Sequence, residues 1–326
     1  MKDKLKKFFH VQRDRLFYLY HRLRNAEFFW HLLNRRSRGV WLRAARRLSS
    51  IEHRVVHDLR QVGIASVPLR EFFPDRDFFT QMSKWVAGRF DDQSVKAEIA
   101  AIEASLADRL KGGRSQSKLR KDFWVNLWPR AENGNSLFMA DNPFLEFLLS
   151  DSVLQIVSAY LGSAPRLKNY SVQRTFIMPT GSPEFLSQRW HRDPEDKRML
   201  KVFIYLSEVD ETGAGPFNYV FESQLGGRWR WFYPQRLPVG RYPEPGVVEK
   251  HIPESFRKPI LAPAGTVIFC DTSGLHKGGY STTKNRTMFF SGFTSVASVY
   301  PISFVRPQPD EQRPLAPLGR YAVSSL

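Results

Sequence analysis

The chain of 326 residues contains a single cysteine, Cys270, so an intrachain disulfide is excluded. This scarcity is typical of a reducing compartment, and we expect a cytoplasmic location. No stretch approaches the roughly 18 consecutive apolar residues that a membrane-spanning helix needs. The first residues lack the apolar core of a signal peptide, because Lys or Arg interrupts every apolar cluster there. The sequence therefore predicts a chain that neither spans a membrane nor is exported.

Acidic residues are scarce relative to basic ones, with 32 Asp or Glu against 49 Lys or Arg, for a net charge of +17. The excess is concentrated in residues 1–50, which contain 14 basic and three acidic side chains and therefore carry +11. A nucleic-acid-binding fold would spread such charge over its surface, so nucleic acid is not the partner we expect. The basic character belongs to the N-terminal segment.

Residues 1–50 are predicted to form a basic amphipathic helical extension. At about 100° per residue, seven apolar side chains fall on one stripe with cations along both edges: Leu5, Phe8, Phe9, Leu16, Leu19, Tyr20 and Leu23. Two interpretations stay open. The stripe lies on an anionic membrane, which would make the protein peripheral to the inner face, or it docks on the protein's own core or on a second subunit. Three acids and few serines argue against a mitochondrial transit peptide.

Residues 51–326 are predicted to form one domain. Helical periodicity dominates its first part, about residues 51–165, with helices expected at 77–110 and 142–161. Short β-branched and aromatic segments follow and predict strands at 167–178, 200–206, 217–221, 258–261, 266–271 and 287–293. Helices followed by many short strands indicate an α+β fold, mainly β, in which a barrel or sandwich at about 166–300 has flanking helices. The tail, residues 301–326, contains five prolines and is predicted to be extended and loosely packed.

A metal site is indicated by His191 and Asp193, which lie two residues apart and would share one face of an extended strand. The pair alone is weak evidence for a metal site, because a surface ion pair can have the same spacing. A second cluster, Gly265–Gly279, places a buried strand before a glycine-rich turn that contains His276. Two histidines and one carboxylate form the ligand set that leaves three positions of iron open. A structural zinc site would need four ligands, commonly cysteines.

Arg286 lies ten residues after His276 and opens an otherwise apolar strand. If two open metal positions chelate the keto-acid end of 2-oxoglutarate, the far carboxylate needs a fixed, bidentate cation. Arg286 is placed for that role, with a surface ion pair as the alternative.

Residues 51–300 resemble the phytanoyl-CoA dioxygenase family of iron(II) and 2-oxoglutarate oxygenases. The resemblance rests on the His191–Asp193 pair, on the block from Gly265 to Arg286, and on the segments Lys201–Asp210 and Gly215–Phe217. The resemblance implies a double-stranded β-helix, a jelly roll of the cupin type. It also implies that His191, Asp193 and His276 bind Fe(II), that Arg286 anchors 2-oxoglutarate, and that O2 is the second co-substrate. Two further positions are candidates for the 2-oxoglutarate pocket, with a plain core face as the alternative: Gln173, by resemblance, and Lys201, by its alternation with Phe203 and Tyr205.

The implied reaction hydroxylates a small-molecule or lipid-linked substrate and releases succinate and CO2. Asp193 favours hydroxylation over halogenation, because halogenating relatives replace this carboxylate with a small residue. The family's Pro-Gly-Ser-His turn reads Phe221–Gln224 here, which puts nearby substrate contacts in doubt. An insertion at Gly226–Pro253 is either a lid over the substrate or a surface loop packed on the barrel. Two competing functions are a non-catalytic binding module and a basic nucleic-acid-binding protein, and the sequence does not indicate the oligomeric state.

Overall fold

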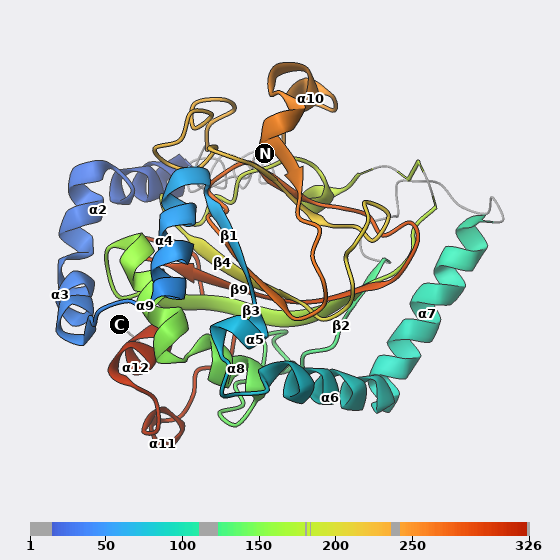
Figure 1. Ribbon diagram of the computed structural model, residues 1–326, viewed down its shortest axis with the longest axis horizontal. Coiled ribbons are helices and arrows are strands. Elements are labelled where there is room, and N and C mark those ends of the chain that lie inside the picture. Colours follow the sequence, from blue (N-terminus) through green and yellow to red (C-terminus); the bar gives the residue numbers. More distant parts are fainter. Residues whose placement is uncertain (1–14, 111–122, 180, 183, 236–241, 325–326) are drawn as a thin grey trace, which may run out of the picture.

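The computed structural model describes residues 15–110, 123–179, 181–182, 184–235 and 242–324. Two antiparallel sheets form the centre of the molecule, and helices surround the larger one (Figure 1). The larger sheet has six strands in the order β1-β7-β4-β9-β3-β2, and the smaller has the order β6-β5-β8. The strands are β1 (Ile64–Pro68), β2 (Trp124–Asn126), β3 (Arg166–Thr175), β4 (Leu200–Tyr205), β5 (Phe217–Val220), β6 (Arg257–Pro259), β7 (Thr266–Cys270), β8 (His276–Gly278) and β9 (Arg286–Thr294).

The six predicted strands correspond to β3, β4, β5, β6, β7 and β9, each within a few residues, and the α+β class is confirmed. Strands β1, β2 and β8 were not predicted. They have three to five residues each, which is too short for alternation to be recognised, and their pairing is with strands distant in the chain. β1 and β2 form the two edges of the larger sheet.

The two faces of the larger sheet differ in what covers them. One face packs on an apolar core that includes Val202, Phe269 and Phe289, with helices on its far side. The other face meets the smaller sheet through a second cluster in which Phe203 and Tyr205 of β4 pack with Phe217 of β5. The space between the two sheets is where the polar candidate residues converge.

Two predicted helices are each divided by a capping residue. The segment at 142–161 forms α8 (Pro143–Leu148) and α9 (Asp151–Leu161), and the Ser150 side chain accepts from the Val153 N–H at the start of α9. The segment at 77–110 forms α6 (Phe78–Asp91) and α7 (Gln93–Leu110), where Asp92 accepts from Ser94 N–H. Short polar side chains compete with helix continuation by forming hydrogen bonds with the local backbone. Apolar periodicity does not register these bonds, so it predicted one continuous helix in each place.

Other helices cover the apolar face or fill connections. α4 (Ser50–Val62) begins with a capping box between Ser49 and Glu52, and α5 (Leu69–Phe72) follows β1. α10 (Val247–His251) lies within the predicted insertion. No helix in the part of the chain that the structure describes is long and apolar enough to cross a membrane.

The prediction of an extended, loosely packed C-terminal tail is wrong. The tail forms α11 (Pro309–Gln312) and α12 (Pro317–Val323), and Leu318, Ala322 and Val323 are buried. Pro309 and Pro317 each occupy the first turn of a helix, where the missing N–H has no helical partner to lose. The prolines therefore start helices here instead of preventing them.

The N-terminal extension is divided into three short helices in its described part, namely residues 15–24, α2 (Glu27–Leu33) and α3 (Arg35–Ala44). Leu5, Phe8 and Phe9 of the predicted stripe lie outside the described residues. The remaining stripe residues are exposed to solvent by about half or more: Leu16 67%, Leu19 54%, Tyr20 53% and Leu23 48%. Docking of this part of the stripe on the protein's own core is therefore wrong, because the helix contacts the core through its opposite face.

Candidate metal centre

Backbone pairing brings His191 and His276 side by side. Each residue donates its N–H to the carbonyl of the other, with both N···O distances 2.9 Å. Asp193, two residues after His191, is also held by a backbone hydrogen bond, since its N–H donates to the Thr272 carbonyl at 2.9 Å. The predicted extended His-x-Asp segment thus exists as an isolated bridge to β8, outside any regular strand.

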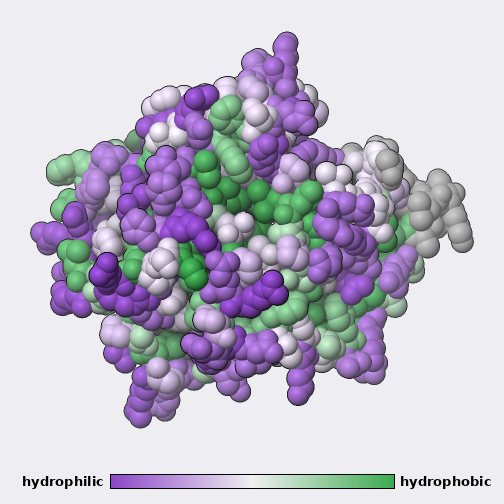
Figure 2. All heavy atoms as spheres, in the orientation of Figure 1, coloured by the Kyte–Doolittle hydropathy of each residue, from purple (hydrophilic) through white to green (hydrophobic). Residues whose placement is uncertain are grey.

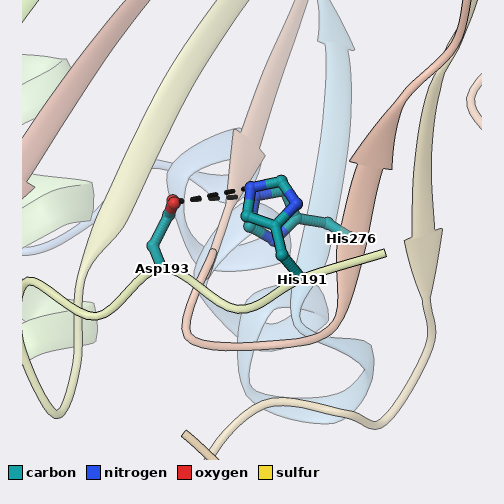
Figure 3. Close-up of side chains that lie close together, drawn as sticks. All are labelled: His191, Asp193 and His276. Carbon is teal, nitrogen blue, oxygen red and sulfur yellow. Dashed lines mark ion pairs between the residues drawn. The ribbon is translucent and has the colours of Figure 1, made fainter. Parts of the chain in front are cut away.

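The three side chains face one another, as Figure 3 shows. Asp193 Oδ1 lies 3.7 Å from His191 Nε2, and Asp193 Oδ2 lies 3.6 Å from His276 Nε2. One ligand atom from each residue fits within 4.8 Å of the others, and all three residues are buried. The convergence predicted from the sequence is confirmed, and these residues form a group that could hold a metal ion.

Hydrogen bonds from the far side of each imidazole select its tautomer. His191 Nδ1 lies 2.8 Å from the Arg189 carbonyl, and His276 Nδ1 lies 3.0 Å from the Gly274 carbonyl. A carbonyl only accepts, so each Nδ1 carries the proton and each Nε2 keeps its lone pair. This is the outer-shell arrangement that orients histidine ligands toward a metal.

The charges of the site also suit a cation. Burial, with the neighbouring His191, lowers the pKa of His276 to about 3, and burial lowers the pKa of His191. Burial opposes ionisation of Asp193, but the neighbouring Lys201 ammonium chiefly outweighs it and holds the pKa of this carboxyl below its ordinary value. At neutral pH the group is two neutral imidazoles and one carboxylate, the protonation state that metal binding requires.

Lys201 was predicted to line a 2-oxoglutarate pocket, and it lies against Asp193, one of the three candidate metal ligands. Its Nζ is 2.6 Å from Asp193 Oδ2, so Lys201 already has an anionic partner. Burial opposes the charged form, but Asp193 and Glu195 outweigh burial and raise the pKa of Lys201 above its ordinary value. Lys201 therefore stays charged beside the carboxylate.

Arg286 differs from Lys201 because it is buried and lacks a partner. Its side chain is 5% exposed, and neither Nε nor Nη1 meets a hydrogen-bond acceptor among the described residues. Burial lowers its pKa. Burying an unpaired guanidinium costs several kcal/mol, on the order of that for other buried ions, so the arrangement points to an anionic ligand.

A cavity of about 330 Å³ joins these groups. His191, His276, Lys201 and Arg286 contribute to its wall, and Gln173 of β3 does so as well. Apolar side chains complete the lining, among them Phe123, Phe185, Phe203, Phe217, Met288 and Phe290. The structure thus brings all six predicted site residues into one region, five around the cavity and Asp193 against three of them.

Arg192 is a residue that the sequence analysis did not identify. Its buried guanidinium donates five hydrogen bonds to backbone carbonyls, at 2.5 to 3.1 Å: those of Ser223, Trp229, Phe232, Tyr233 and Ser273. Burial lowers its pKa to about 10. Arg192 therefore joins the metal segment to the insertion and to the turn before His276. Its position between His191 and Asp193 could have indicated that Arg192 is buried near the site. Its hydrogen-bond acceptors are backbone carbonyls, however, and no sequence motif identifies those.

The turn that carries His276 is held by buried polar contacts. Asp271 accepts from the Tyr160 hydroxyl at 2.5 Å and from Ser273 N–H at 2.9 Å, and burial raises its pKa. A Cβ at Gly274 would overlap the Tyr219 hydroxyl, so glycine is needed for this close approach. Cys270, which precedes Asp271, is fully buried.

The departure at Phe221–Gln224 has a structural explanation. Ser223 Oγ accepts from Leu275 N–H at 2.7 Å, and Gln224 Nε2 donates to the carbonyls of Arg60 and Gln61. This segment therefore fixes the turn before His276 and joins it to α4. The Ser223 hydroxyl and the Gln224 NH2 group are engaged with the backbone, and none of these four residues lines the cavity.

The insertion at 226–253 packs on the barrel, as one of the two interpretations predicted, and its role as a lid over the substrate stays a prediction. Trp229 and Phe232 pack against a cluster that includes Trp190 and Leu275, as a loop packed on the barrel would. Gln235 donates to the Asp193 carbonyl, and the Tyr242 ring lies 5.6 Å from the His191 ring. Residues 236–241 lie outside the described part. The insertion thus borders the metal segment directly.

No family model matches the chain, and no curated protein matches it, so the phytanoyl-CoA dioxygenase resemblance stays a prediction. Solved structures are similar at low identity. They include the non-heme alpha ketoglutarate dependent epimerase SnoN from nogalamycin biosynthesis, at 17% identity and TM-score 0.43 over 76% of this chain and 84% of that one. EctD from S. alaskensis with bound Fe has 15% identity and TM-score 0.43 over 80% and 82%. AviO1 from Streptomyces viridochromogenes Tue57 has 14% and 0.39 over 79% and 100%.

Proposed function

We propose that this protein is an Fe(II)- and 2-oxoglutarate-dependent dioxygenase that hydroxylates a small-molecule or lipid-linked substrate. One observation carries the proposal: a buried, unpaired Arg286 shares a cavity with the convergent His191 and His276. A metal that binds the keto acid and an arginine that binds the far carboxylate together account for both features. The two facing sheets are the expected frame of a double-stranded β-helix.

His191, Asp193 and His276 would hold the iron. Among the described His, Cys, Asp and Glu side chains, no fourth one joins this group, which favours an open catalytic site over a closed structural zinc site. The bound iron would supply activation of O2 coupled to decarboxylation of 2-oxoglutarate to succinate and CO2. Retention of the carboxylate at Asp193 supports hydroxylation rather than halogenation.

The two cations of the cavity would have different roles. Lys201 is paired with Asp193 at 2.6 Å and helps to keep this carboxylate ionised. Arg286 presents free N–H donors and would bind the far carboxylate of 2-oxoglutarate, because a planar guanidinium offers two parallel hydrogen bonds. The aromatic lining, including Phe203, Phe217 and Phe290, would exclude water and surround an apolar C–H bond.

The test is succinate release by the full-length protein with Fe(II), 2-oxoglutarate and air. Even without the substrate we expect slow succinate release, and His191→Ala should abolish it by removing a metal ligand. Arg286→Ala should raise the KM for 2-oxoglutarate by about 100-fold, as expected for loss of a charge-assisted contact of about 3 kcal/mol. Arg70→Ala, at an exposed arginine, is the control and should behave as wild type.

Metal binding gives a second readout that does not depend on turnover. Calorimetry with Mn(II) should show one site in wild type and Arg286→Ala, and none in His191→Ala. Equal succinate release by wild type and His191→Ala would contradict the proposal. Normal metal binding with an unchanged 2-oxoglutarate requirement in Arg286→Ala would place the anchor elsewhere.

A further inference from the structure

The first two described helices of the N-terminal arm, residues 15–44, have their polar and apolar faces reversed relative to a helix that packs on a protein core. The buried residues of the arm are mainly polar, with His21 and Ser37 fully buried and Asn25 and Asn34 nearly so. Helices of globular proteins normally bury an apolar stripe and expose the polar one. The arm therefore attaches largely by hydrogen bonds. Most large apolar side chains of residues 16–32 are left outside, whereas Trp30 is buried and Val40 and Trp41 of α3 pack on the core.

The buried face is attached to the loop that follows the metal ligand Asp193. Trp30 Nε1 donates to Asp196 Oδ1 at 3.2 Å, and the Lys197 N–H donates to Asn25 Oδ1 at 2.7 Å. Arg24 donates to the carbonyls of Val296 and Ala297, just after β9, at 2.5 and 2.9 Å. These directional bonds fix how the arm is rotated, and so they fix which side of it faces outward.

The outward face is rich in large apolar side chains. Of the 14 exposed large hydrophobic residues in the described chain, nine lie in residues 16–42, so the surface is local to the arm. Phe28 is 71% exposed and Leu32 is 51% exposed on α2. Figure 2 shows hydrophobic side chains at the edge of the molecule where α2 lies in Figure 1, among hydrophilic ones. We call the arm surface that contains Leu16, Leu19, Tyr20, Leu23, Phe28, Phe29 and Leu32 the outer apolar face.

Cations border this face. Arg15 and Arg22 lie near the first half of it, and Arg35, Arg36 and Arg38 follow α2. Arg22, Arg35 and Arg36 are exposed and make no ion pair with another described residue. Residues 1–50 carry a net +11. An apolar face edged by free arginines is complementary to a surface that is anionic outside and hydrocarbon inside.

We propose that the outer apolar face docks on an anionic lipid bilayer, with its Leu and Phe side chains in the acyl boundary and its arginines among the headgroups. A second copy of the chain fits less well, because two segments of +11 would be brought together and would repel. Since the arm is attached to the segment after Asp193, docking would hold the metal centre at a fixed place relative to the bilayer. This inference does not depend on the reaction that the site performs.

The test is co-sedimentation of full-length protein with vesicles of phosphatidylcholine, alone or mixed with phosphatidylglycerol. Wild type should bind the anionic vesicles, and added salt should weaken the binding. Phe28→Glu with Leu32→Glu should lower the partition coefficient by about 100-fold, since two apolar side chains can no longer enter the bilayer. Arg22→Gln with Arg36→Gln should lower it by about 25-fold, or about fivefold for each cation, on anionic vesicles only.

Leu261→Glu is the matched control, because Leu261 is 45% exposed far along the chain from the arm. It should bind vesicles as wild type does, and circular dichroism should show that all variants are folded. Wild-type binding by the Phe28→Glu, Leu32→Glu variant would overturn the proposal. If neither protein binds vesicles, and the wild type is a dimer whereas this variant is a monomer, the outer apolar face would instead be an interface with a second copy of the chain.

Discussion

The two faces of the six-stranded sheet are built from the same strands and serve different ends. In β9, Phe289 and Phe293 lie in the apolar core under the helices, whereas Arg286, Met288 and Phe290 line the cavity on the opposite side. The helix-covered face is packed mainly through hydrocarbon contacts, such as the stacked Phe144 and Phe289 rings at 4.8 Å. The cavity face contains an unpaired guanidinium. One face stabilises the fold, and the other is proposed to give up stability in order to bind a ligand.

The largest expected effect is on the helix-covered face. Phe289→Ala should lower the free energy of unfolding by about 3–5 kcal/mol, because it removes a fully buried ring and leaves a cavity between Phe144 and Trp128. Urea denaturation followed by circular dichroism measures this. A loss below about 1 kcal/mol would mean that this face contributes little to stability.

The next effect concerns the ligand that the cavity face is proposed to bind. With Mn(II) in place of Fe(II) to prevent turnover, 2-oxoglutarate at 100 times its Kd should stabilise the wild type by about 2.7 kcal/mol. Arg286→Met should lose most of this gain at the same concentration, whereas Arg70→Ala should keep it. Equal stabilisation of wild type and Arg286→Met would remove Arg286 from the binding site.

In the absence of ligand, Arg286→Met should raise the free energy of unfolding, whereas Phe289→Ala lowers it. Arg286→Met replaces a buried, unpaired cation by an apolar side chain of similar length and should raise the free energy of unfolding by about 2 kcal/mol. The measurement is urea denaturation in the absence of metal and 2-oxoglutarate. A destabilised variant would show that Arg286 supports the fold, and the contrast between the faces would then fail.

The smallest effect is a pH dependence at the end of β9, where buried Asp196 accepts from the Ser295 N–H and Trp30. Burial raises the pKa of Asp196 to about 6, above the ordinary value of 3.8, so the folded state binds a proton more tightly than the unfolded chain. This contribution to stability is full below pH 4 and is lost as pH rises to about 6. Between pH 5 and pH 7 the loss should be about 1–2 kcal/mol, and Asp196→Asn should remove it from parallel denaturation curves.

Residues close together in the chain were predictable because their geometry is local. Runs of β-branched and aromatic residues identified β3, β4, β7 and β9, and the spacing of His191, Asp193, His276 and Arg286 indicated which side chains would converge. The convergence itself follows from β-structure, in which residues two apart share a face. Their roles as ligands and anchor remain proposals, although the geometry supports them.

Helix boundaries and the C-terminal tail were less predictable, because the periodicity of apolar residues contains no information about individual hydrogen bonds. Ser150 and Asp92 divide helices by capping the next one. Pro309 and Pro317 start helices whose stability comes from packing, as the buried Leu318 shows. In each case a local contact or a distant core decides between two conformations that the sequence allows equally.

The sequence by itself determined six of the described strands, the candidate ligand set and the amphipathic character of the N-terminal arm, since each is a periodic or short-range property. Only the tertiary structure decided that Lys201 is paired with Asp193 while Arg286 has no partner among the described residues. It also decided that the arm buries His21 and exposes Leu16. The physical reason is that pairing and burial depend on which distant backbone or side chain occupies the neighbouring space, and periodicity along one segment contains no information about that neighbour.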